Sequence, residues 1–319
     1  MKEIKIDDSN VEEFVKQKIE EISLTVGDNI AINALSGGVD SSTVTLLGYR
    51  ALGDKLKTYF IDSGLMRQDE PKRIVSIFSE LDIPVDIVHA GDLFLKRLKG
   101  IKDPEEKREA ISQTFYRDVF GEIVKKNDAR YLLQGTNYTD VEETVAGIKR
   151  QHNILEQIGI SSEDAYGYKV IEPLIQLRKP SIRRVAKYLG LPEEIYNRMP
   201  FPGPGLAARI IGEVTREKID IVRRATKIVE DELAYLNAFQ SLAILHEDKV
   251  TGIRNNKREY GYQIEIRCWD SEDARLGNPT RLSYDMLEAL ADRITTEIQD
   301  VVSVTYNITK KPPSTIEAV

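Results

Sequence analysis

The sequence predicts an α/β protein, with a parallel sheet covered by helices on both faces and a smaller α+β domain after it. Three observations lead to this prediction. Short apolar runs alternate with helical patterns over residues 1–198 of the 319-residue chain. A glycine-rich turn joins the first apolar strand pattern to a helix. Three prolines and two glycines at 200–205 then precede a second group of helices and strands, which indicates a domain boundary.

Helical spacing of apolar residues at 8–24 predicts a helix that serves packing. The apolar runs that follow predict five strands, at 30–35, 56–61, 85–89, 131–133 and 168–171. A helix predicted at 180–189 closes this part of the chain. Ligands of parallel sheets bind beyond the carboxyl ends of the strands. The polar residues at 36–42, 62–67 and 134–136 are therefore expected to share one site.

The turn at 36–42 reads SGGVDSS and is the centre of the predicted site. Backbone N–H groups at the start of a helix attract anions, and the two glycines let the backbone approach a phosphate closely. The serines add hydroxyl donors, and Asp40 is placed to hold a metal ion that bridges phosphates. The turn lacks both the Gly-Lys-Ser/Thr of the nucleotide-triphosphatase loop and the Gly-x-Gly-x-x-Gly dinucleotide fingerprint. It therefore predicts a phosphate site of another kind.

Two further stretches are candidates for covering a bound ligand. The charged run at 102–109 is expected to be a solvated helix face, with the alternative that Lys107 and Arg108 reach a triphosphate or pyrophosphate when a lid closes. Residues 136–168 are expected to be irregular and to form either a lid or a disordered segment, because loops of this length in compact domains are usually one of the two. His152 lies in the basic stretch 149–153 of this segment, either as a surface histidine or as part of the flap.

The two domains are predicted to span residues 1–198 and 199–319. Apolar spacing in the second domain predicts helices at 216–236 and 284–298 and strands at 240–245, 262–269 and 301–308. Mixed helices and strands of this kind predict an α+β domain.

Composition excludes several classes of protein. A formal net charge of −7 argues against nucleic acid as the main partner. No apolar run approaches the length of a membrane span and the N-terminus lacks a signal-peptide core, so a cytoplasmic protein is expected. A single cysteine, Cys268, excludes an internal disulfide and a metal site built on cysteine pairs.

Five motifs resemble GMP synthetase, and their order and spacing match that family nearly from end to end. They are residues 36–42, 60–67, 134–136, 201–206 with Arg209, and 311–317. The first is typical of the pyrophosphate-grasping loop of ATP pyrophosphatases, whereas the FPGPGL and KPPSTIE motifs are more specific. No amidotransferase domain is present, so the chain resembles the separate ATP-pyrophosphatase subunit of two-subunit, archaeal-type enzymes. The fold that this implies is of the adenine nucleotide alpha hydrolase type.

The resemblance implies a ligase that forms a C–N bond in purine biosynthesis. The O2 oxygen of XMP would attack the α-phosphate of ATP bound with Mg²⁺, giving adenylyl-XMP and pyrophosphate. Ammonia would then displace AMP and give GMP. The ammonia would come from a separate glutamine amidotransferase subunit, and the C-terminal domain would form a homodimer. Neither nucleic acid nor a membrane is an expected partner.

The roles of individual residues are carried over from the family by position. Catalytic roles are implied for Asp40, Lys107, Asp140 and Lys149. ATP contacts are implied for Ser36, Gly37, Gly38, Val39, Asp40, Ser41, Ser42, Asp62, Leu65 and Gly135. Asp40 is also the implied metal ligand. Contacts with the acceptor nucleotide are implied for Arg67, His152, Arg258, Lys311, Thr315, Ile316 and Glu317.

The acceptor side departs from the family pattern at several positions. The lid reads KRQHN where KSHHN is usual, and residues 255–260 read NNKREY where GDGRTY is usual. Asn307 stands where the tail usually has aspartate. Two alternatives therefore stay open beside XMP amination. One is a paralogous ATP pyrophosphatase that adenylates a different nucleotide or base, and the other is a non-catalytic, nucleotide-binding regulatory module.

Overall fold

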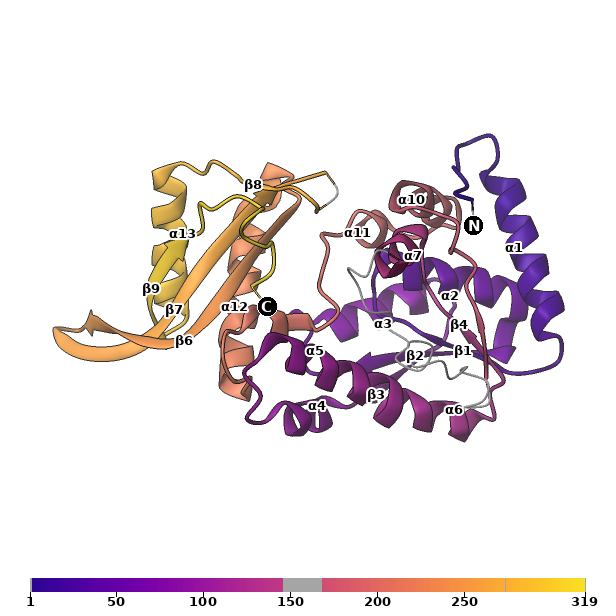
Figure 1. Cartoon of the computed structure of the whole chain (residues 1–319), viewed down its shortest axis with the longest axis horizontal. Coiled ribbons are helices and arrows are strands. Elements are labelled where there is room, and N and C mark those ends of the chain that lie inside the picture. The colour runs from indigo at the N-terminus through magenta and orange to yellow at the C-terminus, as the bar shows by residue number, and fades with distance from the viewer. Residues whose placement is uncertain (1, 146–167, 273, 319) are drawn as a thin grey trace. The chain divides into compact units, whose positions relative to one another are not determined.

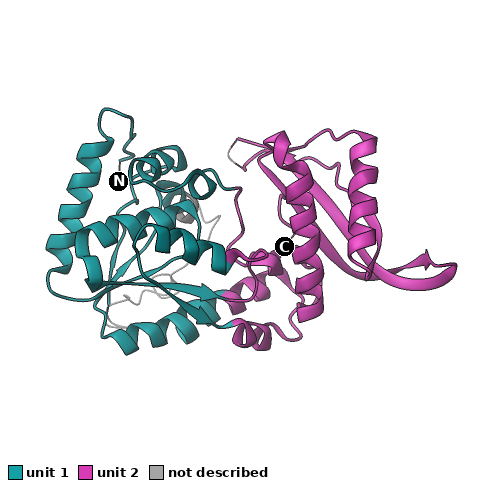
Figure 2. Cartoon of the chain, turned by 180° about the vertical axis from the view of Figure 1, so that it is seen from behind, with its two compact units in different colours: residues 1–62, 71–90, 112–198 teal, residues 63–70, 91–111, 199–319 magenta. Residues whose placement is uncertain are grey.

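The computed structural model describes residues 2–145, 168–272 and 274–318, and the chain divides into two compact units (Figure 2). Unit 1 consists of residues 1–62, 71–90 and 112–198, and unit 2 consists of residues 63–70, 91–111 and 199–319. Two segments that precede residue 198, namely 63–70 and 91–111, thus fold with the C-terminal part of the chain. The assignment of 1–198 and 199–319 to separate functional domains stays a prediction.

Unit 1 is built on a five-stranded sheet in the order β3-β2-β1-β4-β5, and every strand pair is parallel. The strands are β1 (Ala31–Ala34), β2 (Leu56–Asp62), β3 (Val85–His89), β4 (Tyr131–Leu133) and β5 (Lys169–Ile171). The central strand β1 is short and its first three residues are buried, as expected for a strand covered on both faces. The five predicted strands and the parallel sheet are confirmed.

Helices lie on both sides of this sheet (Figure 1). On one side α1 (Val11–Val26), α2 (Val39–Leu52) and α10 (Lys179–Tyr188) pack against one another, and on the other lies α6 (Gly121–Asn127). The remaining helical segments that unit 1 wholly or mostly holds are η1 (Gly53–Lys55), α3 (Glu70–Glu80), η2 (Thr114–Phe120), α7 (Tyr138–Val145) and α11 (Glu193–Tyr196). The prediction of an irregular segment from residue 136 is wrong for α7, whose residues form a regular helix.

The strand order of unit 1 reverses at β1. The chain runs outward from β1 through β2 to β3 and then returns to the opposite side of β1 for β4 and β5. In open α/β sheets the loops that leave the two strands at such a reversal part to opposite faces, and ligands bind beyond their carboxyl ends. The loops after β1 and β4 are therefore the part of this unit most suited to a ligand.

Unit 2 contains a four-stranded sheet built on one long hairpin. Its strands are β6 (Gln240–Arg254), β7 (Lys257–Asp270), β8 (Asn278–Pro279) and β9 (Val301–Tyr306). At the turn of the hairpin, Asn255 and Asn256 have φ of 51° and 57°, values that asparagine tolerates better than most residues. The sequence predicted only the buried ends of β6 and β7. It missed residues 246–261 because that part of the hairpin is largely polar and exposed.

Two helices of unit 2 pack on this sheet. Helix α12 (Arg216–Leu233) packs on β6, and α13 (Tyr284–Glu297) packs on β9. Both begin at side-chain caps, since the hydroxyls of Thr215 and Ser283 each accept a backbone hydrogen bond at 3.3 Å. The other helical segments of unit 2 are α4 (Gly91–Leu98), α5 (Pro104–Gln113, whose last two residues belong to unit 1), η3 (Gly205–Arg209) and η4 (Ala234–Leu236).

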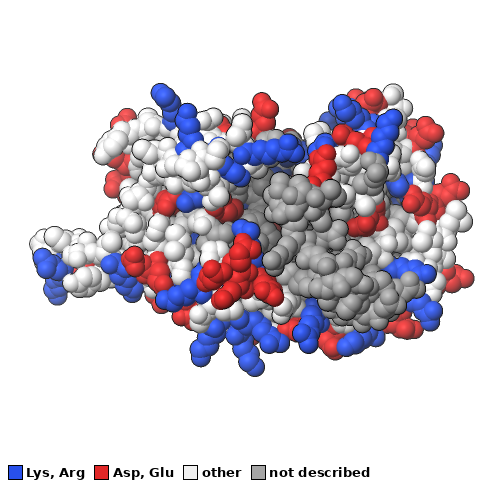
Figure 3. Space-filling view, in the orientation of Figure 1, with Lys and Arg blue, Asp and Glu red and all other residues white. Residues whose placement is uncertain are grey.

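The C-terminal tail is part of the core of unit 2. Ile316 is 6% exposed and packs with Leu242 and Ile244 of β6 and with Trp269 of β7. A tail fixed in this way can present neighbouring residues in a defined position. Among the described residues, no helix combines the length and the apolar character needed to cross a bilayer. Acidic and basic side chains are interspersed over the described surface drawn in Figure 3.

Candidate functional site

The glycine-rich turn joins β1 to the N-terminus of α2. Gly38 is the residue before the helix, with φ −77° and ψ 159°, and no described side chain caps the helix there. The backbone N–H groups of the first helical turn have no intrahelical acceptor, and the helix dipole makes this end positive. The turn therefore has the local structure of an anion site, as the sequence predicts.

The backbone of this turn requires glycine at position 37. Gly37 has φ 78°, and a Cβ there would lie 2.9 Å from two side-chain carbons of Ile74 and 3.3 Å from Arg198 Nη1. Two serines close the turn, since the hydroxyl oxygens of Ser36 and Ser41 lie 2.9 Å apart. The backbone N–H of Ser36 also donates to Ser41 Oγ at 3.1 Å. The loop is thus held in shape by its own side chains.

The loop after β4 touches the glycine-rich turn directly. A Cβ at Gly135 would lie 3.1 Å from the carbonyl carbon of Asp40 and from the backbone nitrogen of Ser41. Any larger residue at 135 would displace the backbone that begins α2. Asn137, which is 3% exposed, donates from Nδ2 to Asp40 Oδ2 at 3.2 Å. Of the three polar stretches predicted to share one site, the structure thus brings 36–42 and 134–136 together in unit 1, whereas residues 63–67 of the third belong to unit 2. That the three form one site stays a prediction.

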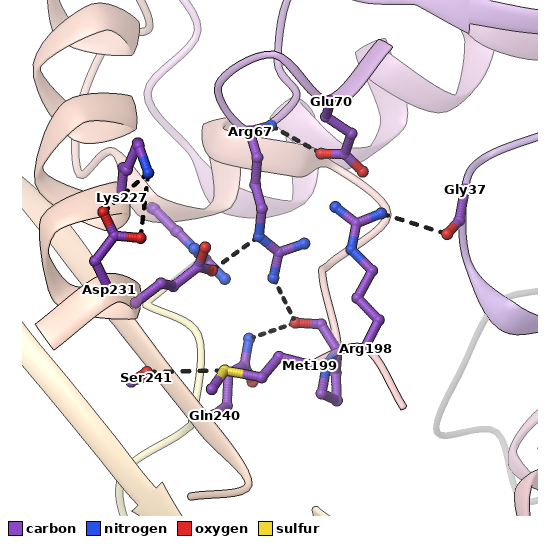
Figure 4. A network of polar contacts seen from close by, with 12 residues as sticks. Gly37, Arg67, Glu70, Arg198, Met199, Lys227, Asp231, Gln240 and Ser241 are labelled. Atoms are coloured by element: carbon purple, nitrogen blue, oxygen red, sulfur yellow. Dashed lines mark hydrogen bonds and ion pairs between the residues drawn. The ribbon is translucent and has the colours of Figure 1, made fainter. Parts of the chain in front are cut away.

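Two cationic side chains also reach the turn, and both were missed from the sequence. Lys179 forms an ion pair with Asp40 Oδ2. Arg198 Nη1 donates to the carbonyl oxygen of Gly37 at 3.3 Å, as Figure 4 shows. The sequence did contain a sign that Lys179 has an anionic partner. It is the first residue of α10, where the helix dipole disfavours a positive charge. A lysine in that place suggests a partner elsewhere, here the carboxylate of Asp40.

The carboxylate of Asp40 has one oxygen engaged and one without a partner. Oδ2 accepts from Lys179 and Asn137, whereas Oδ1 is buried and makes no hydrogen bond with any described residue. Among those residues the buried hydroxyl of Ser42 is likewise without a hydrogen-bond partner. A buried acceptor without a partner is costly unless a ligand or ion completes it. Asp40 is therefore the strongest candidate for contact with a bound cation.

Other predicted site residues of unit 1 lie at or near the same strand ends. Asp62 is the last residue of β2, and its Oδ2 lies 3.4 Å from Nδ1 of His89. Asp140 lies in the first turn of α7, and its Oδ2 accepts from the backbone N–H of Asn137 at 3.1 Å. Asp140 is thereby linked through Asn137 to Asp40. Lys149 and His152 lie outside the described residues.

Segment 63–70 of unit 2 packs on the proline-rich motif. The carbonyl oxygen of Leu65 accepts from the backbone N–H of Leu206 at 2.7 Å. Gly205 has φ 62°, and a Cβ there would lie 2.4 Å from that same oxygen. The glycine is therefore needed for this close approach. Leu65 itself is 1% exposed, so a contact with adenosine would have to involve its backbone, and that role stays a prediction.

Arg67 is held by several partners in unit 2 (Figure 4). Its Nε forms an ion pair with Glu230 at 2.8 Å, and its Nη2 donates to the carbonyl oxygen of Pro200 at 3.4 Å. The guanidinium also lies over the ring of Phe201, 4.3 Å from the centroid. Gln240 donates to the same Pro200 oxygen at 3.2 Å. A role of Arg67 in binding the acceptor nucleotide stays a prediction.

The predicted acceptor residues of the tail are brought together within unit 2. Glu317 accepts from Nε and Nη2 of Arg209, both at 3.1 Å, and from Gln240 Nε2 at 2.6 Å. Arg209 is fully buried, so this carboxylate neutralises a guanidinium that water does not reach. The hydroxyl of Thr315 donates to the carbonyl oxygen of Glu317 at 2.5 Å. The backbone of Lys311 pairs with Gly277.

Arg258 is not part of that group. It is exposed and pairs with Ile253 beside the turn of the β6–β7 hairpin. Trp269, against which the tail packs, lies at the other end of β7. The described contacts therefore do not join Arg258 to the tail, and its role as an acceptor contact stays a prediction.

Lys107 is buried, although its charged surroundings in the sequence predicted a solvated face. It lies on α5, is 1% exposed, and donates from Nζ to the carbonyl oxygen of Ile210 at 2.7 Å. Burial lowers the pKa of Lys107 to about 8, and the charge of Lys218 lowers it in the same direction. The prediction of a solvated side chain is therefore wrong for Lys107, because its ammonium group donates to a carbonyl oxygen inside the protein. Its catalytic role stays a prediction.

The Lys107→Met variant is expected to change how the stability of unit 2 depends on pH. The pKa of Lys107 is about 8 in the folded chain and near 10.5 in the unfolded chain. The unfolded chain therefore binds more protons between these values, so the wild-type free energy of unfolding rises with pH in that window and the penalty is fully present below it. Urea unfolding followed by the fluorescence of Trp269, the single tryptophan, measures this. The wild-type stability minus that of the variant should rise by about 2 kcal/mol from about pH 7.5 to about pH 9.5. A constant difference would contradict the assignment.

Unit 1 thus combines a parallel sheet, a glycine-rich turn at a helix N-terminus, a carboxylate with a buried free oxygen, and two cationic side chains. These features define a nucleotide-binding α/β protein. Within the described residues no group of three or more histidine, cysteine, aspartate or glutamate side chains is placed to hold a metal ion by itself.

Comparison with known proteins gives the family. Residues 227–318 match the family described as GMP synthase C terminal domain. The chain is 48% identical over 309 residues to a GMP synthase (glutamine-hydrolyzing) subunit of Archaeoglobus fulgidus, covering 97% of this chain and 99% of that protein. It is 47% identical over 311 residues to the subunit of the same name in Pyrococcus abyssi, with coverage of 97% and 99%. The chain belongs to this family of GMP synthase subunits.

Two further similarities extend the comparison. The chain is 42% identical over 317 residues to a longer GMP synthase (glutamine-hydrolyzing) of Halothermothrix orenii, of which it covers 61%. Among solved structures it is similar to an NH3-dependent NAD synthetase from Campylobacter jejuni in complex with the nitrate ion. That similarity has a TM-score of 0.47 and 16% sequence identity, and covers 72% of this chain and 88% of the other.

Proposed function

We propose that this chain catalyses the ATP-dependent amination of XMP to GMP, through an adenylyl-XMP intermediate and with release of AMP and pyrophosphate. The observation that carries the proposal is similarity along nearly the whole chain to proteins named as one subunit of GMP synthase (glutamine-hydrolyzing). Chemically, adenylylation converts the C2 carbonyl oxygen of XMP into a phosphoryl leaving group, which ammonia can displace. The protein has to orient two nucleotides and neutralise the departing pyrophosphate.

The turn at 36–42 is proposed to hold the β- and γ-phosphates. The uncapped N-terminus of α2 supplies backbone N–H donors, and Lys179 and Arg198 supply positive charge near the turn. Lys179 now neutralises Asp40, so it is placed to exchange that carboxylate for a phosphate oxygen when ATP binds. Asp62, Leu65 and Gly135 are proposed to border the adenosine.

The residues at the turn fit a magnesium ion that arrives with ATP. Mg²⁺ prefers oxygen ligands and is commonly bound by one or two carboxylates together with substrate phosphates and water. Asp40 offers a buried Oδ1 that has no partner among the described residues. Asp40 would hold the ion, which would supply charge neutralisation at the phosphates. Asn137 holds the other oxygen of the carboxylate and so orients Oδ1 after Lys179 has moved to a phosphate oxygen.

The tail of unit 2 is proposed to bind the acceptor. Lys311, Thr315, Ile316 and Glu317 would contact the phosphate and ribose of XMP, with further contacts from Arg67, His152 and Arg258. Lys107, Asp140 and Lys149 are proposed to act at the reacting groups. Ammonia would come from a separate glutamine amidotransferase subunit, since the relatives are named as one subunit of a glutamine-hydrolyzing enzyme. Unit 2 is proposed to pair with its copy in a homodimer.

The proposal predicts pyrophosphate release that depends on the acceptor. Wild-type protein with ATP, Mg²⁺ and ammonium should release pyrophosphate when XMP is added and should form GMP in equal amount. Inosine monophosphate is a matched control, because it lacks the C2 oxygen that would attack ATP. An absence of release with XMP, in folded protein that binds ATP, would contradict XMP as the acceptor. Release that another nucleotide triggers would favour a paralogue with a different acceptor.

A further inference from the structure

A largely buried carboxylate in unit 2, that of Glu265 on β7, connects three segments of the chain. Its side chain is 12% exposed. Oε2 lies 2.9 Å from Nε2 of His246, while Oε1 accepts from Nε of Arg267 at 2.5 Å and from Nδ2 of Asn307 at 3.0 Å. These partners come from β6, from β7 itself and from the residue that follows β9. Both oxygens of Glu265 are therefore used, and none of the roles assigned above involves this residue.

Glu265 is charged at neutral pH. Burial raises the pKa of Glu265, but the hydrogen bonds from His246, Arg267 and Asn307, together with the charge of Arg267, outweigh it and bring the pKa to about 2. Because an ionised carboxylate only accepts hydrogen bonds, the His246 nitrogen that faces it carries a proton. The group is thus a satisfied ionic cluster.

A β-bulge allows His246 to reach this carboxylate. The register of β6 against β7 shifts between Leu245 and Lys249, so residues 246–248 are not in regular pairing. Bulges redirect side chains, and here two neighbouring residues serve different groups. His246 contacts Glu265, while Glu247 accepts from Lys218 at 3.2 Å and from Lys102 at 3.1 Å. The bulge therefore places the His246 side chain against the carboxylate of Glu265.

Arg267 carries the connection from Glu265 to the C-terminal tail. Its Nη1 donates to the carbonyl oxygen of Thr315 at 2.7 Å and to that of Ile316 at 3.3 Å. The guanidinium is planar, so a carboxylate that fixes Nε also fixes the direction of Nη1. Arg267 is 8% exposed, which leaves it little freedom to find other partners. The chain of contacts runs from Glu265 through Arg267 to the backbone of the tail.

We propose that Glu265 is a positioning residue for the acceptor nucleotide: by fixing Arg267, it holds the tail at 311–317 in its binding conformation. The substrate named here rests on the proposed function. Loss of the carboxylate charge frees Arg267 to change rotamer, and the carbonyls of Thr315 and Ile316 lose a fixed donor. The tail then has to be ordered when the acceptor binds, and that ordering weakens the binding. The ATP site in unit 1 contains none of these residues.

The variant Glu265→Gln tests this proposal, since it keeps the size of the side chain and removes its charge. We expect the KM for XMP to rise about tenfold, because ordering a few residues costs roughly that much in affinity. The KM for ATP should stay within about twofold, and kcat at saturating XMP within about threefold. An equal rise in both KM values with a loss of kcat would show a general structural role and would overturn the proposal.

Hydrogen exchange of the tail amides provides a readout that needs no substrate. Peptides that cover residues 311–318 should exchange about tenfold faster in Glu265→Gln than in the wild type, because local opening sets exchange rates. Unchanged exchange would overturn the proposal. If wild-type protein shows no XMP-dependent pyrophosphate release, the proposed function fails, and this measurement alone decides whether Glu265 positions the tail.

A double variant shows whether Glu265 acts through Arg267. Arg267→Met should raise the KM for XMP at least as much as Glu265→Gln, and the double variant should be no worse than Arg267→Met alone. Additive effects of the two substitutions on the KM for XMP would overturn the connection.

Glu259→Gln is the matched control, because Glu259 lies on the same strand and accepts from Arg254 at 2.9 Å, away from the tail. It should leave both KM values unchanged. If Glu265→Gln does not fold, His246→Ala removes one hydrogen bond of the cluster and should show the same pattern more weakly, whereas an unchanged KM would overturn the proposal.

Discussion

Replacing Asp40 with asparagine is expected to lower XMP-dependent pyrophosphate release by about 10²–10³-fold, the usual loss when one group that stabilises a developing charge is removed. The reason is the position of Oδ1, which is buried and has no partner among the described residues. Asparagine keeps the shape of the side chain but removes the negative charge that would hold a cation at the phosphates. The measurement is the rate of pyrophosphate release with saturating ATP and XMP.

A second aspartate in unit 1 provides the matched control. Asp28 forms an exposed ion pair with Lys55 at 2.8 Å and precedes β1, whereas the turn follows that strand, so Asp28→Asn should keep full activity. Thermal unfolding of Asp40→Asn should show that the variant is folded. A folded Asp40→Asn protein that keeps a third or more of the wild-type rate would contradict the role proposed for Asp40.

The variant Glu317→Gln is expected to reduce the stability of unit 2 by about 3 kcal/mol, because breaking a buried ion pair leaves an uncompensated charge. The remaining charge is that of Arg209, which is fully buried and whose Nε and Nη2 both lie 3.1 Å from Glu317. Urea unfolding followed by Trp269 fluorescence measures the loss, since Trp269 packs beside the tail. The KM for XMP should rise as well if the tail binds the acceptor.

The control for this variant is an exposed pair in the same unit. Glu297 accepts from Nε of Arg293 at 2.7 Å, and both side chains are more than a third exposed. Glu297→Gln should therefore cost less than about 1 kcal/mol. If Glu317→Gln and Glu297→Gln lowered the free energy of unfolding equally, the burial of Arg209 would not be the cause of the loss. A stability loss without any change in KM would separate the tail from acceptor binding.

The parts of the fold and site that depend on local sequence could be predicted. The strands of unit 1 appear as short, mainly apolar runs, because a strand covered on both faces buries most of its side chains. The turn at 36–42 was predictable for a similar reason. Gly37 has to accept a positive φ and leave room for Ile74, and only glycine does both.

The parts that depend on distant contacts could not be predicted. Lys179 pairs with Asp40 across 139 positions, and Arg209 pairs with Glu317 across 108. A single sequence contains no signal for either pairing, apart from the unusual position of Lys179 at a helix start. Lys107 shows the same limit. Its charged neighbours predict an exposed side chain, but Lys107 lies on the buried face of α5.

In the hairpin of unit 2, polar side chains make two paired strands hard to predict from the sequence. Residues 246–261 lack the apolar alternation of a buried strand, yet 249–254 pair in register with 257–262. The bulge that brings His246 to Glu265 interrupts the alternation further. Backbone pairing, which the pattern of side chains does not reveal, holds this part of the sheet together.

Transfer of oxygen from XMP to AMP is the most direct test of adenylyl transfer to the acceptor. XMP labelled with ¹⁸O at C2 is incubated with the protein, ATP, Mg²⁺ and ammonium, and the AMP formed is analysed by mass spectrometry. If the C2 oxygen attacks the α-phosphate, each AMP formed with GMP carries one ¹⁸O from XMP. Unlabelled AMP formed together with GMP would contradict an adenylyl-XMP intermediate.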